Sequence, residues 1–208
     1  CVRNVDFDKV CVMLAGLLSP EGTRNVLMGD QAGDALLGGS DNIAIGQEAL
    51  SAEDGHGRNI AIGSLALQSQ NAGADAYNVA IGHNAGLSVS TGIKNILIGG
   101  QAGDSLTTGS YNIAIGHEAL QYENTHGGNV AVGYLSLTSQ RAGADAYNTV
   151  MGYEAGKLVS TGVGNTIMGA FAGDALTTGA KNIAIGYGAL STEDGHGKNT
   201  AIGYSALN

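Results

Sequence analysis

The chain is built from one short unit that repeats along almost its whole length. Each unit begins with Asn, continues with three mostly apolar residues and a Gly, and usually carries Ala three positions after that Gly. Most units are 17 residues long, and two are 19 residues long. Four successive units make a 70-residue repeat, in which longer sequence segments recur. A unit this short cannot bury a core alone, so its copies must stack into a solenoid. The eleven starts are Asn25, Asn42, Asn59, Asn78, Asn95, Asn112, Asn129, Asn148, Asn165, Asn182 and Asn199.

Each unit predicts one short strand followed by a corner. Ile43, Ala44 and Ile45 follow Asn42, and triplets rich in Ile and Val favour a strand. Gly46 ends the triplet, as suits a corner in a left-handed or otherwise strained conformation. We therefore predict an all-β fold, a parallel β-solenoid of twelve 17–19-residue coils. Neighbouring strands would lie about 4.8 Å apart.

The first of the twelve coils is a worn copy of the unit. Extending the register backwards places its start at Asp8, its last strand residue at Cys11, and Val12 where other coils have Gly. Terminal copies of a repeat array are expected to diverge because they cap it. We predict a degenerate capping coil over residues 1–24 and the repeat array over residues 25–208, together forming one domain. Cys11 is expected to be a small buried hydrophobe.

The strands are apolar on both faces, which predicts burial on both sides. The last residue of each strand is expected to point into the coil, as Ile45 would. The middle residue, most often Ala as at Ala44, is then expected to face outward and to let a neighbouring subunit approach closely. This pattern predicts a homo-oligomer, and we expect a homotrimer.

The asparagines that begin the coils predict a second kind of contact between coils. Stacked Asn side chains carry both donors and acceptors, so they can hydrogen-bond up and down an array. The two 19-residue steps end at Asn78 and Asn148, each preceded by a Tyr. The extra residues predict bulged loops in which Tyr77 and Tyr147 cover the end of the core.

Charge and composition exclude several functions. There are 18 Asp and Glu against 9 Lys and Arg, a formal net charge of −9, which disfavours nucleic acid and anionic membrane surfaces. No apolar run approaches the roughly 20 residues of a membrane span. The 35 Gly follow no collagen period, and 43% hydrophobic residues is too many for a disordered chain.

One column of equivalent positions, directly after the corner Gly, is rich in rings and is the candidate contact surface. An exposed strip of such rings could stack on sugars or on partner side chains, whereas a buried or self-stacked strip would only stabilise adjacent coils. Both interpretations stay open from the sequence. The residues are Tyr134, Tyr153, Tyr187, Tyr204, His83 and His117.

Acidic and histidine-bearing turns suggest metal binding only weakly. His56, His126 and His196 occupy equivalent turns, but copies four coils apart would lie about 19 Å apart at the usual strand spacing, too far to share an ion. We expect solvated turns there. Further acidic turns lack the Gly-Asp nonapeptide of calcium-binding solenoids, so we expect no metal and no cofactor. These are the turns at Asp34, Asp75, Asp104, Asp145 and Asp174.

The repeat Asn-Ile-Ala-Ile-Gly-x-x-Ala resembles the head repeats of trimeric autotransporter adhesins of the YadA-like type. Residues 164–207 look still more like the Gly-Asn-Thr-Ala-Ile-Gly-Tyr repeats of bacteriophage tail-fibre-like proteins. The resemblance implies a left-handed β-roll, a trimer, and an extracellular place on a virion fibre or a bacterial surface. It also implies a host or cell-surface glycan or protein as the partner. Adhesin heads use shorter coils, which is a departure.

The function expected from these features is a non-enzymatic structural or adhesive fibre segment. The alternative is an enzyme of the hexapeptide-repeat acyltransferase type, since the stretch from Ile45 to Ala49 matches one hexapeptide. Residues 51–58 do not match, and 17-residue and 19-residue steps break an 18-residue coil. Ice binding is disfavoured, because Ile and Val fill most of the column that holds Thr149, Thr166 and Thr200.

Overall fold

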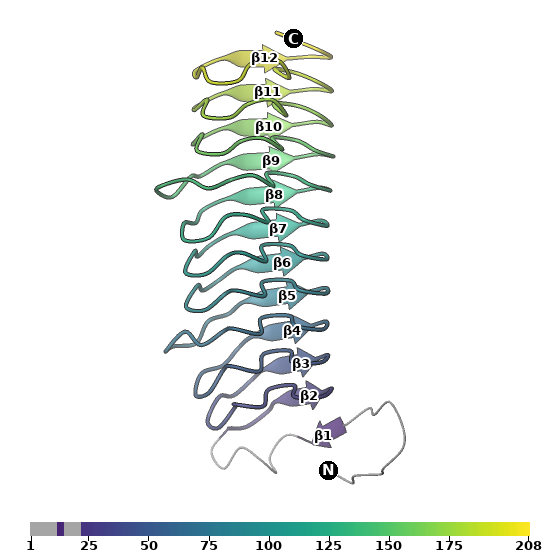
Figure 1. Ribbon diagram of the computed structural model, residues 1–208, viewed down its shortest axis with the longest axis vertical. Helices are drawn as coiled ribbons and strands as arrows, with labels where there is room; N and C mark the ends of the chain where they lie inside the picture. The colour runs from purple at the N-terminus through teal and green to yellow at the C-terminus, as the bar shows by residue number, and fades with distance from the viewer. Residues whose placement is uncertain (1–11, 15–21) are drawn as a thin grey trace.

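The computed structural model describes residues 12–14 and 22–208, and in these residues twelve three-residue strands form a single sheet in chain order (Figure 1). From β2 onward the strands are parallel and in register, so that Ile43 lies beside Ile60. The predicted all-β parallel solenoid is confirmed. The described residues include no helix suited to crossing a membrane. The strands are β1 (Val12–Leu14), β2 (Val26–Met28), β3 (Ile43–Ile45), β4 (Ile60–Ile62), β5 (Val79–Ile81), β6 (Ile96–Ile98), β7 (Ile113–Ile115), β8 (Val130–Val132), β9 (Thr149–Met151), β10 (Thr166–Met168), β11 (Ile183–Ile185) and β12 (Thr200–Ile202).

The first strand departs from the predicted register. β1 runs antiparallel to β2 and pairs Val12 with Met28, so the described residues hold eleven parallel rungs, one fewer than predicted. The predicted start at Asp8 and the strand position of Cys11 lie outside the described residues. The capping role of residues 1–24 stays a prediction.

The corner glycines explain why a valine cannot continue the parallel stack. Gly116 has a φ of 137°, and a Cβ built on it would lie 2.3 Å from the carbonyl oxygen of Gly133 on the next rung. The same geometry recurs at Gly29, where the contact is 2.4 Å. L-residues rarely adopt this backbone conformation, and a side chain would also collide with the rung beside it. In the predicted register Val12 would fall in this column, where a valine cannot form the regular corner; the structure instead pairs Val12 with Met28 of β2.

The middle residue of each strand faces the core, contrary to the predicted orientation. Ala44 and Ala114 are fully buried, whereas Ile115 beside the latter is 37% exposed. The alanines are therefore the narrow interior of the coil and cannot form a subunit interface. Because successive strand residues point to opposite faces, the flanking residues point outward, and the predicted orientation is wrong.

The rest of the core is filled by one large side chain per coil at alternating places. Where the position eight residues after Asn is Leu, as at Leu50, the position three further on is polar, as at Glu53. Where the first position is Gly, as at Gly103, the second is apolar, as at Leu106. All four of these residues are buried in the interior of the coil. A Cβ on Gly103 would meet Leu97 at 2.8 Å, so the glycine makes room for a leucine in the strand.

The outward residues of the strands form one continuous apolar surface, which we call the outer strip. It consists of the first and third residues of each strand from β2 to β12. Every one is Ile, Val or Met except for three threonines, and none is charged. Many are exposed to more than a third: Val26, Ile81, Ile96, Ile115, Met151, Met168, Ile183 and Ile202.

The predicted asparagine ladder is present, with a bond pattern different from amide-to-amide stacking. The backbone N–H of Asn112 donates to the Oδ1 of Asn95 at 2.9 Å. The Nδ2 of Asn112 donates to the backbone carbonyl of His126 in its own coil at 3.2 Å. The same pair of bonds recurs with small variations along the array. Each Asn thus holds two backbone segments together inside the stack.

The two longer coils project as loops between β4 and β5 and between β8 and β9, at the left edge of the stack (Figure 1). The bulge is confirmed, but the tyrosines do not cover the core. Tyr77 and Tyr147 lie outside, the latter 66% exposed. The core there is closed instead by Ala76 and Ala146, which are fully buried.

Candidate functional site

The rings that follow the corner glycines form a ladder over the last six rungs, which we call the aromatic ladder. Successive ring centroids lie 5.2–5.8 Å apart. Three pairs are stacked and the two that involve Phe171 are T-shaped. The members are His117, Tyr134, Tyr153, Phe171, Tyr187 and Tyr204.

The ring faces of the ladder are largely occupied by contacts with neighbouring rings of the same ladder. Tyr134 has the imidazole of His117 against one face and Tyr153 against the other, at 5.8 and 5.2 Å. A sugar needs a free face to stack on, and among the ladder tyrosines Tyr204 on the last rung, 80% exposed, has a ring neighbour on one side alone. The hydroxyl of Tyr153 hydrogen-bonds to Glu154, which raises the pKa of this tyrosine above its usual value. The geometry favours a ladder that stabilises adjacent coils.

The sequence prediction of this ladder missed one ring and included one that stands apart. Phe171 belongs to the neighbouring column, but its ring fills the gap left by Ala170 between Tyr153 and Tyr187. His83 is separated from His117 by Gly100 on the intervening rung. The sequence signal for Phe171 was its size: it directly follows Ala170, and a large side chain next to a small one can fill the space that the small one leaves in the ring column.

A second surface feature is the column of residues that directly precede the asparagines. In the first 70-residue copy it is filled by charged pairs. Arg24 forms an ion pair with Asp41, and the guanidinium of Arg58 reaches Asp41 at 4.0 Å as well as Asp75. Arg58 also lies 5.3 Å from the ring centroid of Tyr77. Each charged group in this stretch thus has an opposite charge or a ring beside it.

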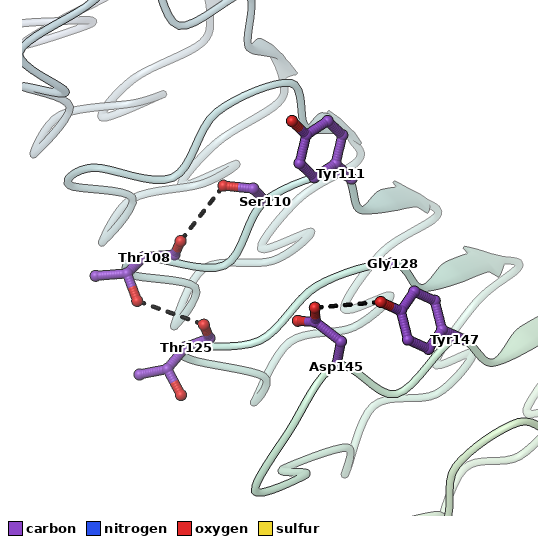
Figure 2. Close-up of a pocket in the computed structure, with 7 residues that line it drawn as sticks. All are labelled: Thr108, Ser110, Tyr111, Thr125, Gly128, Asp145 and Tyr147. Atoms are coloured by element: carbon purple, nitrogen blue, oxygen red, sulfur yellow. Dashed lines mark hydrogen bonds between the residues drawn. The ribbon is translucent and has the colours of Figure 1, made fainter.

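The second copy of the same column contains a hollow of about 370 Å³, which we call the tyrosine hollow (Figure 2). Gly128 lies between two exposed tyrosines, and a carboxylate lies at its side. Figure 2 shows the hydroxyl of Tyr147 facing Asp145, to which it donates at 3.4 Å. Polar hydroxyls form the opposite wall. The lining residues are Thr108, Ser110, Tyr111, Thr125, Gly128, Asp145 and Tyr147.

Two of the three glutamates in the histidine turns are buried, so the expectation of solvated turns was wrong for these two. Glu53 and Glu123 are fully buried, and burial raises the pKa of each carboxyl. The Oε1 of Glu53 accepts the backbone N–H of His56 at 3.0 Å, and the bond recurs between Glu123 and His126. The next rung covers these turns, which the sequence alone did not indicate.

Two of these turns bring three possible metal ligands within 4.8 Å of one another: Glu53, Asp54 and His56 in one, and Glu193, Asp194 and His196 in the other. The third turn has Asn124 in place of the Asp. All three turns share the bond from the His backbone to the Glu carboxylate. Their common role is therefore to close the turn.

The aspartates of the long loops brace the preceding rung. Asp145 accepts the backbone N–H of Gly127 at 2.9 Å, and Asp75 accepts that of Gly57 at 3.2 Å. These bonds account for one carboxylate oxygen of each Asp. The other oxygen faces outward, toward Arg58 in the first copy and toward Tyr147 in the second.

Comparison with known proteins assigns the chain to no family, since no family model, no curated protein and no solved structure matches it. The function is therefore inferred from the geometry of the surface.

Proposed function

We propose that this chain is a non-enzymatic segment of an extracellular fibre, as in a phage tail fibre or a bacterial surface adhesin, and that it acts as a homotrimer. The outer strip carries the proposal. It runs without a charged residue along all eleven parallel strands, with Ile202 exposed to 67%. An apolar face this long marks a surface that a partner covers. Three copies around one axis would bury three strips against one another.

The stack also has the mechanical character that a fibre needs. Every parallel rung is tied to the next by strand pairing and by an asparagine whose Oδ1 accepts the next backbone N–H, for example between Asn95 and Asn112 at 2.9 Å. Buried hydrogen bonds of this kind strengthen one another when they run in chains. The result is a rod that resists bending and presents equivalent surfaces at regular intervals.

Attachment to a cell-surface glycan or protein is the role we propose for the exposed sides of this rod. Each contact can be weak, because three chains and repeated units raise the effective concentration of the next contact. The surplus of acidic residues, 18 against 9 basic ones, favours a partner with positive or neutral groups.

The experiment compares the wild-type chain with the double variant Ile81→Glu, Ile115→Glu and with Thr91→Glu as a matched control. Both isoleucines belong to the outer strip, whereas Thr91 is exposed on a loop. Sedimentation should give trimers for the wild type and the control and monomers for the double variant. Retention on arrays of glycans and surface proteins should fall on the order of 100-fold in the monomer. Equal retention by monomer and trimer would remove the support for a multivalent fibre.

A further inference from the structure

The first 70-residue copy shows what group the column before the asparagines is built to hold. Arg58 lies between Asp41 and Tyr77, with its guanidinium paired to the carboxylate of Asp75 and its Cζ 5.3 Å from the tyrosine ring centroid. It also donates to the hydroxyl of Tyr77. Carboxylate, phenol hydroxyl and ring face together satisfy a planar cation. Arg58 adopts a φ of 63°, so the position accepts a full side chain.

The second copy keeps one of the two carboxylates and the tyrosine, has Tyr111 in place of Asp41, and lacks the cation. Asp145 and Tyr147 stand one 70-residue repeat after the aspartate and tyrosine that hold Arg58, but Gly128 stands in the place of the arginine. The Asp145 backbone bond, to the N–H of Gly127, is the same as in the first copy. Within residues 22–208, no lysine or arginine forms an ion pair with Asp145. The ring of Tyr147 lies over Gly128, where the arginine side chain begins in the first copy, and the space beside this ring and Asp145 forms the tyrosine hollow.

The walls of the hollow suit a cation that enters from outside. Tyr147 lies against Gly128, where a Cβ would meet its ring at 2.7 Å, because no side chain there holds the ring away. Tyr111 stands on the other side, 60% exposed, with the Lys94 ammonium from the preceding rung 5.2 Å from its centroid. Because the Lys94 ammonium lies against Tyr111 and forms no ion pair with Asp145, the carboxylate of Asp145 has no positive charge paired with it.

We propose that the tyrosine hollow binds the guanidinium of an arginine side chain on a partner protein, in the place that Arg58 fills in the first copy. The carboxylate of Asp145 would receive the N–H groups, and the ring of Tyr147 would lie against the guanidinium plane. This inference names the partner chemistry of the proposed attachment and rests on that function. The net charge of −9 adds a long-range attraction for such a partner.

The test uses the full chain and a small probe, N-acetyl-L-arginine N-methylamide, titrated while amide NMR shifts are followed. The citrulline analogue has nearly the same shape without the charge, and methyl glucoside represents neutral sugars. We expect saturable shifts at Gly128 and Tyr147 with the arginine probe alone. Asp145→Asn should weaken binding at least tenfold, and Gly128→Arg should abolish it by filling the hollow. Asp75→Asn, the matched change in the first copy, should leave it unaltered.

Several results would overturn the inference. They are equal binding of arginine and citrulline probes, binding of the sugar alone, absence of any saturable shift, or insensitivity to Asp145→Asn. The mass of the same samples separates this inference from the proposed fibre function. A trimer that does not bind the arginine probe refutes the proposed arginine site and is consistent with the fibre function. A monomer that binds the probe refutes the trimeric fibre and supports the arginine site.

Discussion

Glu53 and Gln70 occupy the same column on adjacent rungs, and both side chains are fully buried. The Oε2 of Glu53 and the Nε2 of Gln70 have no hydrogen-bond partner among the described protein atoms. The arrangement returns one 70-residue repeat later at Glu123 and Gln140, also fully buried. Two polar pairs thus lie in the interior in addition to the asparagine ladder, and the glutamate of each pair makes the stability of the array dependent on pH.

Replacing both buried glutamates by glutamine should stabilise the protein at neutral pH. Burial raises the pKa of Glu53 and Glu123 above that of a free glutamate, about 4.3. Between that value and the raised pKa the folded chain binds more protons than the unfolded chain, so stability falls as pH rises through this window. Denaturant unfolding of Glu53→Gln, Glu123→Gln at pH 4 to 8 should show a weaker pH dependence and a higher midpoint at pH 7.

Glu193 is the matched control for this prediction. It occupies the equivalent turn of the β11 coil, where it is partly exposed, and its carboxyl pKa is lowered because the backbone N–H of His196 donates to it. A carboxyl whose pKa is lowered in the folded state stabilises the fold at pH values above its unfolded pKa. Glu193→Gln should therefore leave the protein equally stable or slightly less stable at pH 7. Stabilisation by Glu193→Gln as large as that by the double variant would contradict the role of burial.

Removing one asparagine from the ladder should weaken the whole stack. Asn112→Ala leaves the backbone N–H of Asn129 and the carbonyl of His126 without their partners. Each buried group left unpaired costs about 1–3 kcal/mol. Asn199 on the last rung has an Nδ2 with no partner, so Asn199→Ala should cost less. Chemical unfolding of the two variants decides this, and equal losses would argue against the ladder.

The corner glycines allow backbone strain and steric collision to be separated. Gly116→Ala introduces a Cβ 2.3 Å from the carbonyl oxygen of Gly133, at a φ of 137°. Gly203 has a φ of 126° but nothing within 4 Å of its would-be Cβ. Gly203→Ala should therefore cost only the strain, about 1–3 kcal/mol. Gly116→Ala should cost clearly more, measured by the shift in thermal midpoint, and similar shifts would show that the rungs are not packed this tightly.

Adjacent residues of one strand should respond in opposite ways to a charge. Ala114 faces the core and is fully buried, so Ala114→Asp should unfold the array, because it buries an unpaired carboxylate. Ile115 belongs to the outer strip, so Ile115→Asp should separate the subunits while the circular dichroism spectrum of the fold persists. Unfolding by the second variant and tolerance of the first would restore the orientation predicted from the sequence.

The repeat was sufficient to predict the stack, because a 17-residue spacing that returns Asn, Gly and Ala to the same columns leaves few alternatives. The direction of each strand residue was not predictable from Ile43, Ala44 and Ile45, since all three are apolar. The structure places the methyl group of Ala44 inside and the larger flanking side chains outside, and a larger middle residue such as Leu97 is accommodated where a glycine, here Gly103, makes room.

The candidate sites were harder to predict because they depend on neighbours in adjacent coils. The tyrosines after the corner glycines were found from their column, but the stacking of Tyr134 between two rings, which removes its free faces, required coordinates. The tyrosine hollow was missed. Its signal was present in the sequence as the change from Arg58 to Gly128 between two copies of the 70-residue repeat, beside an aspartate and a tyrosine that do not change.

The mass of the wild-type chain in solution tests the central claim, that copies of the protein cover the outer strip. Light scattering after size exclusion should give three times the chain mass of 20.8 kDa, without dissociation on dilution to micromolar concentration. A well-folded particle of 20.8 kDa that stays soluble and monomeric would contradict the account, since the apolar face would then need no cover.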